Sequence, residues 1–207
     1  MTDFIRPRLF LVTPPLSLAE DFAPTLEKAL AAGDVACVLL RFATPDEGLR
    51  KKIAKALAPL IQKAEAATLV LDDAQLAARA GLDGAHITGA SEAFDDALAS
   101  LKPERIVGVG DLADRDAAMR VGETDVDYLL FGALDAQDND AVVTLEWTCW
   151  WAELFNIPCV GVAHAPEEVG ALAKSGAEFV GLGPSFIADT EKIAAAQALI
   201  DALEPTA

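Results

Sequence analysis

The sequence is short of the residues that build disulfide frameworks and zinc sites. It has only three cysteines, and they form no CxxC pair and have no neighbouring histidine. This spacing disfavours both kinds of site. We therefore expect Cys37, Cys149 and Cys159 to be small buried hydrophobes, and we expect the protein to work in a reducing cytoplasm.

Positive charge is also scarce. The chain carries 16 Lys and Arg against 33 Asp and Glu, a formal net charge of −17, and its pI is near 4.3. Such a surface repels polyanions, so neither nucleic acid nor an anionic membrane is an expected partner. The mean hydropathy of +0.31 comes largely from alanine. No apolar run is long enough to span a bilayer, and we find no signal peptide in MTDFIRPR.

No Pro, Gly or Ser linker divides residues 1–207, which predicts one domain. Its clearest pattern lies in Thr68–Gly89. There a short apolar strand stops at Asp72 and Asp73, a helix follows, Gly81 ends it in the left-handed conformation, and a second strand begins at once. The pattern of a helix that ends in Gly before an apolar strand recurs ahead of Asp127 and of Glu178. Short β-α-β connections are typical of parallel strands in one sheet.

Further strand and helix patterns complete the chain. The expected strands are Arg8–Thr13 before a Pro14-Pro15 break, Asp34–Phe42, Arg105–Val109, Asp127–Phe131, Ile157–Val162 and Glu178–Gly183. The expected helices are Leu18–Ala31, one from Pro45, Glu92–Leu101, one from Leu112, Leu145–Phe155, Pro166–Lys174 and Ile187–Leu203. Eight strand-helix pairs predict a compact (β/α)8 TIM barrel, with an open doubly wound sheet as the alternative.

An aromatic stripe marks the helix near residue 150. Trp147, Trp150, Trp151 and Leu154 fall at i, i+3, i+4 and i+7, one face of a helix. Core packing against the sheet is the first interpretation. Because Trp150 and Trp151 are adjacent, one of them is also a candidate anchor for a homodimer interface.

Several segments together resemble one enzyme family, the thiamine-phosphate synthases. They are RLFLVT, VLLRF, LDDAQLAARAGLDGAHITG, GETDVDYLLFGAL and IPCVGVA. The central segment is similar to the family pattern I-N-D-R, eight residues, then A-D-G-V-H-L-G-Q. The resemblance implies a TIM barrel and a transferase of thiamine biosynthesis, which joins a pyrimidine pyrophosphate to a thiazole phosphate with Mg²⁺ and releases pyrophosphate.

The resemblance is weaker where the family's chemistry takes place. Of the family's Q-L-R-x-K only Arg41 remains, and of its I-N-D-R one metal aspartate, Asp72, remains. The second metal aspartate falls near Ser91, and the family's G-G-I reads Ala163-His164-Ala165. Where the family has cations and hydroxyls, this chain has acids: Asp73, Asp111, Asp135 and Asp138. An acidic rim opposes a departing pyrophosphate, which predicts a degenerate site.

Barrel active sites lie at the carboxyl ends of the strands. The candidate residues there are Thr13, Arg41, Asp72, Asp73, His86, Thr88, Asp111, His164 and Ser185. Arg41 and Asp72 are the predicted catalytic residues. Arg41 either binds a phosphate group or forms an ion pair with Asp72. Of Asp72 and Asp73, at least one is expected to cap a helix, and both are candidate Mg²⁺ ligands.

The remaining candidates concern phosphate. Gly181-Leu182-Gly183-Pro184-Ser185 leads into the last helix, where barrels often bind phosphate through backbone N–H groups, although a plain turn explains it nearly as well. The predicted phosphate-binding residues, besides Arg41, are Gly183, Ser185, His86 and His164.

The sequence leaves two functions open for this protein. One is a divergent thiamine-phosphate synthase, and the other is a non-catalytic relative that binds a small phosphorylated ligand or a protein partner.

Overall fold

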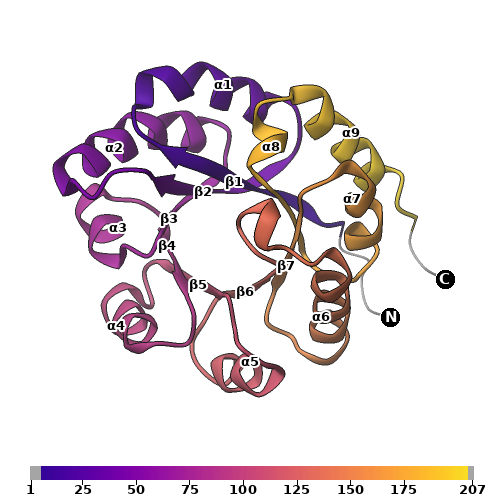
Figure 1. Cartoon of the computed structure of the whole chain (residues 1–207). Coiled ribbons are helices and arrows are strands. Elements are labelled where there is room, and N and C mark those ends of the chain that lie inside the picture. The colour runs from indigo at the N-terminus through magenta and orange to yellow at the C-terminus, as the bar shows by residue number, and fades with distance from the viewer. Residues whose placement is uncertain (1–5, 205–207) are drawn as a thin grey trace.

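The computed structural model describes residues 6–204. Eight parallel strands form a closed barrel in which each strand pairs with the next along the chain, and helices surround it (Figure 1). The barrel closes where Arg8 to Leu11 of the first strand pair with Phe179 to Leu182 of the last. The predicted closed barrel is confirmed, and the open sheet is excluded.

The strands are short and the helices alternate with them. The strands are β1 (Arg8–Leu16), β2 (Val35–Phe42), β3 (Ala67–Leu71), β4 (Gly84–Thr88), β5 (Ile106–Gly110), β6 (Tyr128–Phe131), β7 (Cys159–Ala163) and β8 (Phe179–Leu182). The helices are α1 (Ala19–Ala31), α2 (Glu47–Lys63), α3 (Ala74–Ala80), α4 (Glu92–Leu101), α5 (Arg115–Gly122), the 3-10 helix η1 (Ala136–Asp138), α6 (Ala141–Leu154), α7 (Pro166–Ala173), α8 (Pro184–Ile187) and α9 (Thr190–Asp201). Within residues 6–204, no helix combines the length and the apolar character that a membrane crossing requires.

Capping residues set several of these boundaries. Gly81 ends α3 with φ of +69°, the left-handed conformation expected of it. Asp140 accepts hydrogen bonds from the N–H groups of Val142 and Val143, so α6 begins at Ala141 rather than at Leu145. Asp189 starts α9 in the same way, so the predicted last helix begins at Thr190 rather than at Ile187, and the short helix α8 precedes it.

Two local expectations are wrong. Strand β1 does not stop at the Pro14-Pro15 pair but continues to Leu16, with a register shift against β2 between Val12 and Pro15. The bulge accommodates the missing proline N–H groups. Gly122, the glycine before the Asp127 strand, has no left-handed φ. A Cβ there would lie 2.7 Å from the ring of Trp151, so Gly122 makes room for that ring.

The apolar side chains form two layers. One lies between the strands and the surrounding helices and includes Leu9, Leu11 and Trp151. The other fills the inside of the barrel with side chains from alternate strand positions: Phe10, Val12, Cys37, Leu39, Leu69, Tyr128, Leu130, Val160 and Val162. This alternation is what a strand covered on both faces requires.

Tyr128 occupies the barrel interior beside a strand that carries glycines. Its ring lies 5.6 Å from the rings of both Phe10 and His86. A Cβ on Gly108 would overlap the Tyr128 ring, and one on Gly110 would lie 2.9 Å from Nε2 of His86. The two glycines of β5 thus leave the space that the Tyr128 and His86 rings fill.

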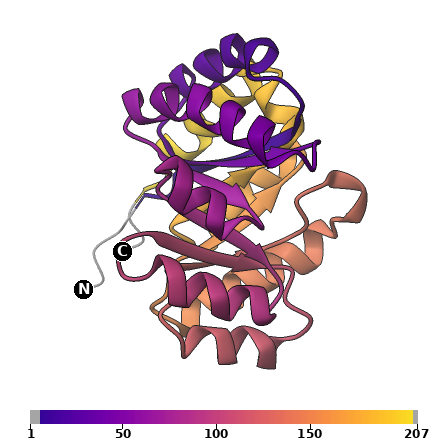
Figure 2. The same cartoon turned by 90° about the vertical axis from the view of Figure 1, so that its left-hand side faces the viewer.

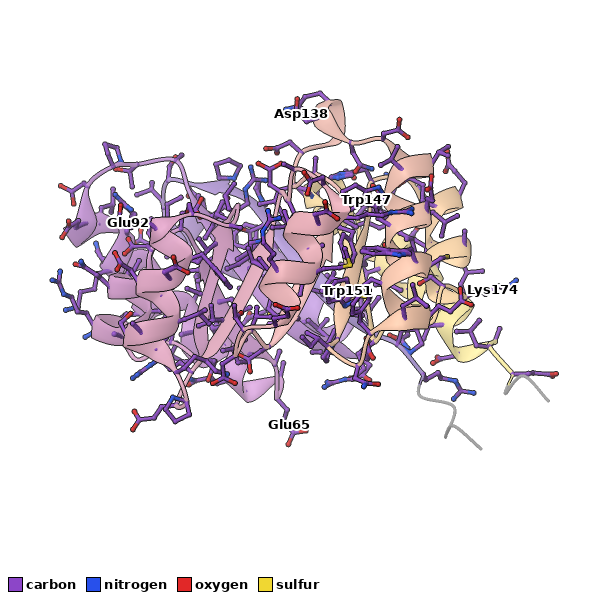
Figure 3. All side chains as sticks on the ribbon, turned by 90° about the horizontal axis from the view of Figure 1, so that it is seen from below. Glu65, Glu92, Asp138, Trp147, Trp151 and Lys174 are labelled. Carbon is purple, nitrogen blue, oxygen red and sulfur yellow. The ribbon has the colours of Figure 1, made fainter. Side chains whose placement is uncertain are left out.

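The tryptophan stripe is only partly core. Trp151 is fully buried, donates from Nε1 to the carbonyl of Ile157 at 2.8 Å and stacks on Phe155 with centroids 4.0 Å apart. Trp147 and Trp150 are half-buried. Leu154, which the spacing assigned to the same face, is 63% exposed. Figure 3 shows Trp147 and Trp151 one above the other along α6.

We predict that Gly108→Ala destabilises the protein by about 1–3 kcal/mol, the usual cost of overpacking a core, because the new methyl group would overlap the Tyr128 ring. The matched control is Gly170→Ala in α7, where a Cβ meets nothing within 4 Å. That change should be neutral or should stabilise the helix by about 0.5–1 kcal/mol. Urea unfolding of both variants measures the difference, and equal midpoints would contradict this account of the interior.

Candidate functional site

The carboxyl ends of the strands open on one side of the barrel, and the segment between β6 and α6 stands out from that side (Figure 2). In Figure 1 the same segment lies across the centre of the ring. Figure 3 shows Asp138 at its tip and Glu65, between α2 and β3, at the opposite end of the molecule. We call the open side the mouth and residues 132–140 the mouth loop.

Arg41 is the buried cation of the mouth. It is the last residue but one of β2, and its N–H donates to Oγ1 of Thr13 at 3.0 Å, so a side chain replaces a backbone acceptor at the β1 bulge. Its guanidinium forms a two-point ion pair with Asp135, Nη1 to Oδ1 at 3.0 Å and Nη2 to Oδ2 at 2.5 Å. Nη1 also donates to the carbonyl of Leu134. Arg41 thus joins β1, β2 and the mouth loop.

The expected ion pair of Arg41 exists, but its partner is Asp135 and not Asp72. The hydrogen bond from Arg41 lowers the pKa of Asp135, burial opposes this shift, and the positive charge of Arg41 lowers the pKa further. Asp135 is therefore ionised at neutral pH. It lies 94 residues from Arg41 in the chain, and no local pattern connects the two.

Asp72 is held by the next strand. Its Oδ1 accepts from the N–H of Thr88 at 2.7 Å and its Oδ2 from the Thr88 hydroxyl at 2.8 Å. The backbone of Asp72 has φ of +50°, a left-handed conformation that costs a non-glycine residue energy. The two hydrogen bonds from Thr88 offset that cost and fix the carboxylate at the rim of the mouth.

Asp73 is the helix cap. It accepts from the N–H of Leu76 at 2.9 Å and pairs with Arg50 at 3.0 Å. Because the cap and the ion pair occupy its carboxylate, Asp73 is poorly placed to bind Mg²⁺. Within residues 6–204, no three His, Cys, Asp or Glu side chains gather where they could share a metal ion. The described residues therefore offer no ready-made cluster of metal ligands, and magnesium binding by Asp72 or Asp73 stays a prediction.

His86 lies inside the barrel and is only 2% exposed. Its Nδ1 is 2.9 Å from the hydroxyl of Tyr128. Burial lowers its pKa from 6.5 to about 3, so the ring is neutral at pH 7 and brings no positive charge to the mouth. It can still exchange a hydrogen bond with a neutral group of a ligand.

His164 and Ser185 support the mouth loop and the turn after β8. Nε2 of His164 lies 2.9 Å from the carbonyl of Ala133, which can only accept, so Nε2 carries the proton. The Ser185 hydroxyl donates to the carbonyl of His164 at 3.3 Å. The N–H of Gly183 donates to Ala163 at 2.8 Å and is not free for a phosphate. Phosphate binding by Gly183, Ser185 and the two histidines remains a prediction, and these bonds do not favour it.

A hollow of about 340 Å³ lies beneath the mouth loop, within the usual size range of small-ligand sites. His86, Thr88, Asp111, Asp135 and Asp138 are among its lining residues. Asp111 stands at the end of β5 with φ of +55°. The structure thus brings together in one hollow three of the four acids that the sequence placed at the rim.

A closed parallel barrel with polar side chains around a hollow at its carboxyl mouth places the chain among the (β/α)8-barrel proteins. The family described as "Thiamine monophosphate synthase" matches residues 9–182. The chain is 37% identical to the thiamine-phosphate synthase of Rhodospirillum centenum over 178 residues, 84% of this chain and 86% of that protein. It is 30% identical to that of Hyphomonas neptunium over 200 residues, 91% and 88% of the two chains.

Among solved structures, the thiamine phosphate pyrophosphorylase from Pyrococcus furiosus superposes with a TM-score of 0.79 at 16% identity, covering 95% of this chain and 96% of that one. This similarity supports the fold. The chain belongs to the thiamine monophosphate synthase family, and the resemblance seen in its sequence is confirmed.

Proposed function

We propose that this protein acts as a thiamine-phosphate synthase of low turnover, which joins a pyrimidine pyrophosphate to a thiazole phosphate at the mouth. The relatives named as thiamine-phosphate synthases support the reaction. The observation that carries the proposal is the buried guanidinium of Arg41, beside the mouth loop that covers a ligand-sized hollow. A planar guanidinium binds phosphate oxygens through paired hydrogen bonds.

The low turnover follows from charge. When the bond to pyrophosphate breaks, the electron pair leaves with the pyrophosphate, and its growing negative charge needs cations or donors nearby. Asp111, Asp135 and Asp138 line the hollow instead, and His86 is neutral. Losing one preorganised donor of this kind lowers a rate by roughly 10²–10³, so several losses predict slow catalysis.

Magnesium is part of the proposal only as an ion that enters with the substrate. Mg²⁺ binds one or two carboxylates and takes its other ligands from water and phosphate oxygens. Asp72, fixed by Thr88, is the carboxylate that would meet it. Bound there, the ion would supply positive charge to the pyrophosphate.

The test is an assay of purified protein with both thiamine precursors and Mg²⁺, scored for thiamine phosphate, together with complementation of a synthase-deficient bacterium. We expect measurable turnover well below about 1 s⁻¹, the lower end for ordinary enzymes.

Arg41→Ala should weaken substrate binding by about 2 kcal/mol. The control is Arg8→Ala: Arg8 starts β1 at the other end of the barrel and pairs with Asp34, and its loss should leave binding unchanged.

Two results would overturn the proposal. Turnover of 1 s⁻¹ or more would show that the acidic mouth does not impair catalysis. No turnover at all, with retained binding of a phosphorylated ligand, would point to the non-catalytic alternative.

We further propose a homodimer, formed through the outer face of α6. Trp151 belongs to the core and cannot contribute to the interface. Trp150 is half-buried, and Cζ of Arg115 lies 4.8 Å from the centroid of its ring. Val142 and Leu154 on the same helix are 76% and 63% exposed. Leu154→Glu should shift sedimentation at micromolar concentration from dimer to monomer. A wild-type protein that sediments as a monomer would contradict the proposed homodimer.

A further inference from the structure

We infer that Asp135 competes with phosphate for the anion site. Its carboxylate binds the guanidinium of Arg41 and must leave before a phosphate group can bind there. The inference rests on the proposed function in that it assigns the anion site to Arg41. It makes Asp135 a residue that sets the affinity and the selectivity of the mouth for phosphorylated ligands.

The geometry of the pair supports competition. Both oxygens of Asp135 face both terminal nitrogens of Arg41, the arrangement that two oxygens of a phosphate group would adopt. Carboxylate and phosphate would therefore use the same donors. The two cannot occupy that edge of the guanidinium at once.

Exposure shows which partner can move. The Arg41 side chain is 10% exposed and that of Asp135 is 37% exposed. Arg41 is fixed by β2 and by the bond of its N–H to Thr13. Asp135 is the residue before η1, but its side chain makes no capping hydrogen bond, so its carboxylate is committed to Arg41 alone among the described residues. A ligand reaches the guanidinium by replacing Asp135.

The base of the mouth loop is held by hydrogen bonds that do not involve Asp135. Oδ1 of Asn139 accepts from the N–H of Ala133 at 3.0 Å and from the Thr144 hydroxyl at 2.9 Å. The carbonyl of Ala133 also lies 2.9 Å from Nε2 of His164. Gly132, with φ of +94°, precedes this base. The part of the loop that carries Asp135 is held by the bonds from Arg41 to Asp135 and to the Leu134 carbonyl. Once these bonds break, it can move away from Arg41 while the base of the loop stays in place.

The experiment measures binding of inorganic pyrophosphate, without Mg²⁺, by calorimetry at fixed ionic strength. Asp135→Asn removes the charge but keeps an oxygen that accepts from Arg41. We expect it to bind pyrophosphate about tenfold more tightly than the wild type, a change that corresponds to about 1.4 kcal/mol. The matched control is Asp125→Asn, which removes the same charge at an exposed position just before β6, at the end of the barrel away from the mouth. Its gain should be less than threefold, because solvent and salt screen a charge that makes no contact.

Three outcomes would overturn the inference. They are an unchanged affinity in Asp135→Asn, equal gains in the two variants, which indicates general charge repulsion, and a gain that persists in the double variant Arg41→Gln/Asp135→Asn. Thermal unfolding of each variant confirms that it is folded. Because the probe is pyrophosphate and not turnover, the inference can fail while the synthase assay succeeds, and the reverse.

A second measurement uses the wild-type chain and needs no variant. Saturating pyrophosphate should speed the hydrogen exchange of amides in the mouth loop, including Asp138, whose N–H bonds to the carbonyl of Asp135. Exchange in β2 should not rise. Unchanged or slower exchange in the mouth loop would contradict displacement of Asp135.

Discussion

The closure of eight short strands imposes the constraint on which the rest of this structure depends. A closed barrel has an interior that side chains must fill, because voids cost stability. Here the Tyr128 ring fills part of that space, and Gly108 on β5 makes room for it. Its hydroxyl lies 2.9 Å from Nδ1 of His86, and His86 is among the residues that line the hollow at the mouth. Packing inside the barrel thus fixes the position of His86, a polar residue of the candidate site.

The mouth shows how one fold tolerates a reversal of local charge. Arg41 is a buried cation that needs an anionic partner. The chain supplies that partner, Asp135, on a loop that comes from the other side of the ring. Arg50 forms a similar ion pair with Asp73. Both cations are thus already paired in the free protein. A ligand must gain more from Arg41 than Asp135 does.

Signals within one strand-helix unit were readable from the sequence. The helix Ala74–Ala80 and its Gly81 cap appear where the local pattern placed them, and the repetition of such units predicted the barrel. Contacts between strand-helix units that lie far apart in the chain could not be predicted from the sequence. Gly122 is a packing residue for Trp151, and the chain reaches Leu16 in β1 through two prolines by means of a bulge. The partner of Arg41 depends on which loop crosses the mouth, and that is a property of the assembled ring.

The most direct measurement of the central claim is a crystal structure of the protein with thiamine phosphate, the product of the proposed reaction. The account predicts that the phosphate group lies within hydrogen-bonding distance of both terminal nitrogens of Arg41, that Asp135 has left them, and that the Asn139 bonds at the base of the mouth loop are intact. Phosphate bound elsewhere, with the pair of Arg41 and Asp135 unbroken, would contradict it.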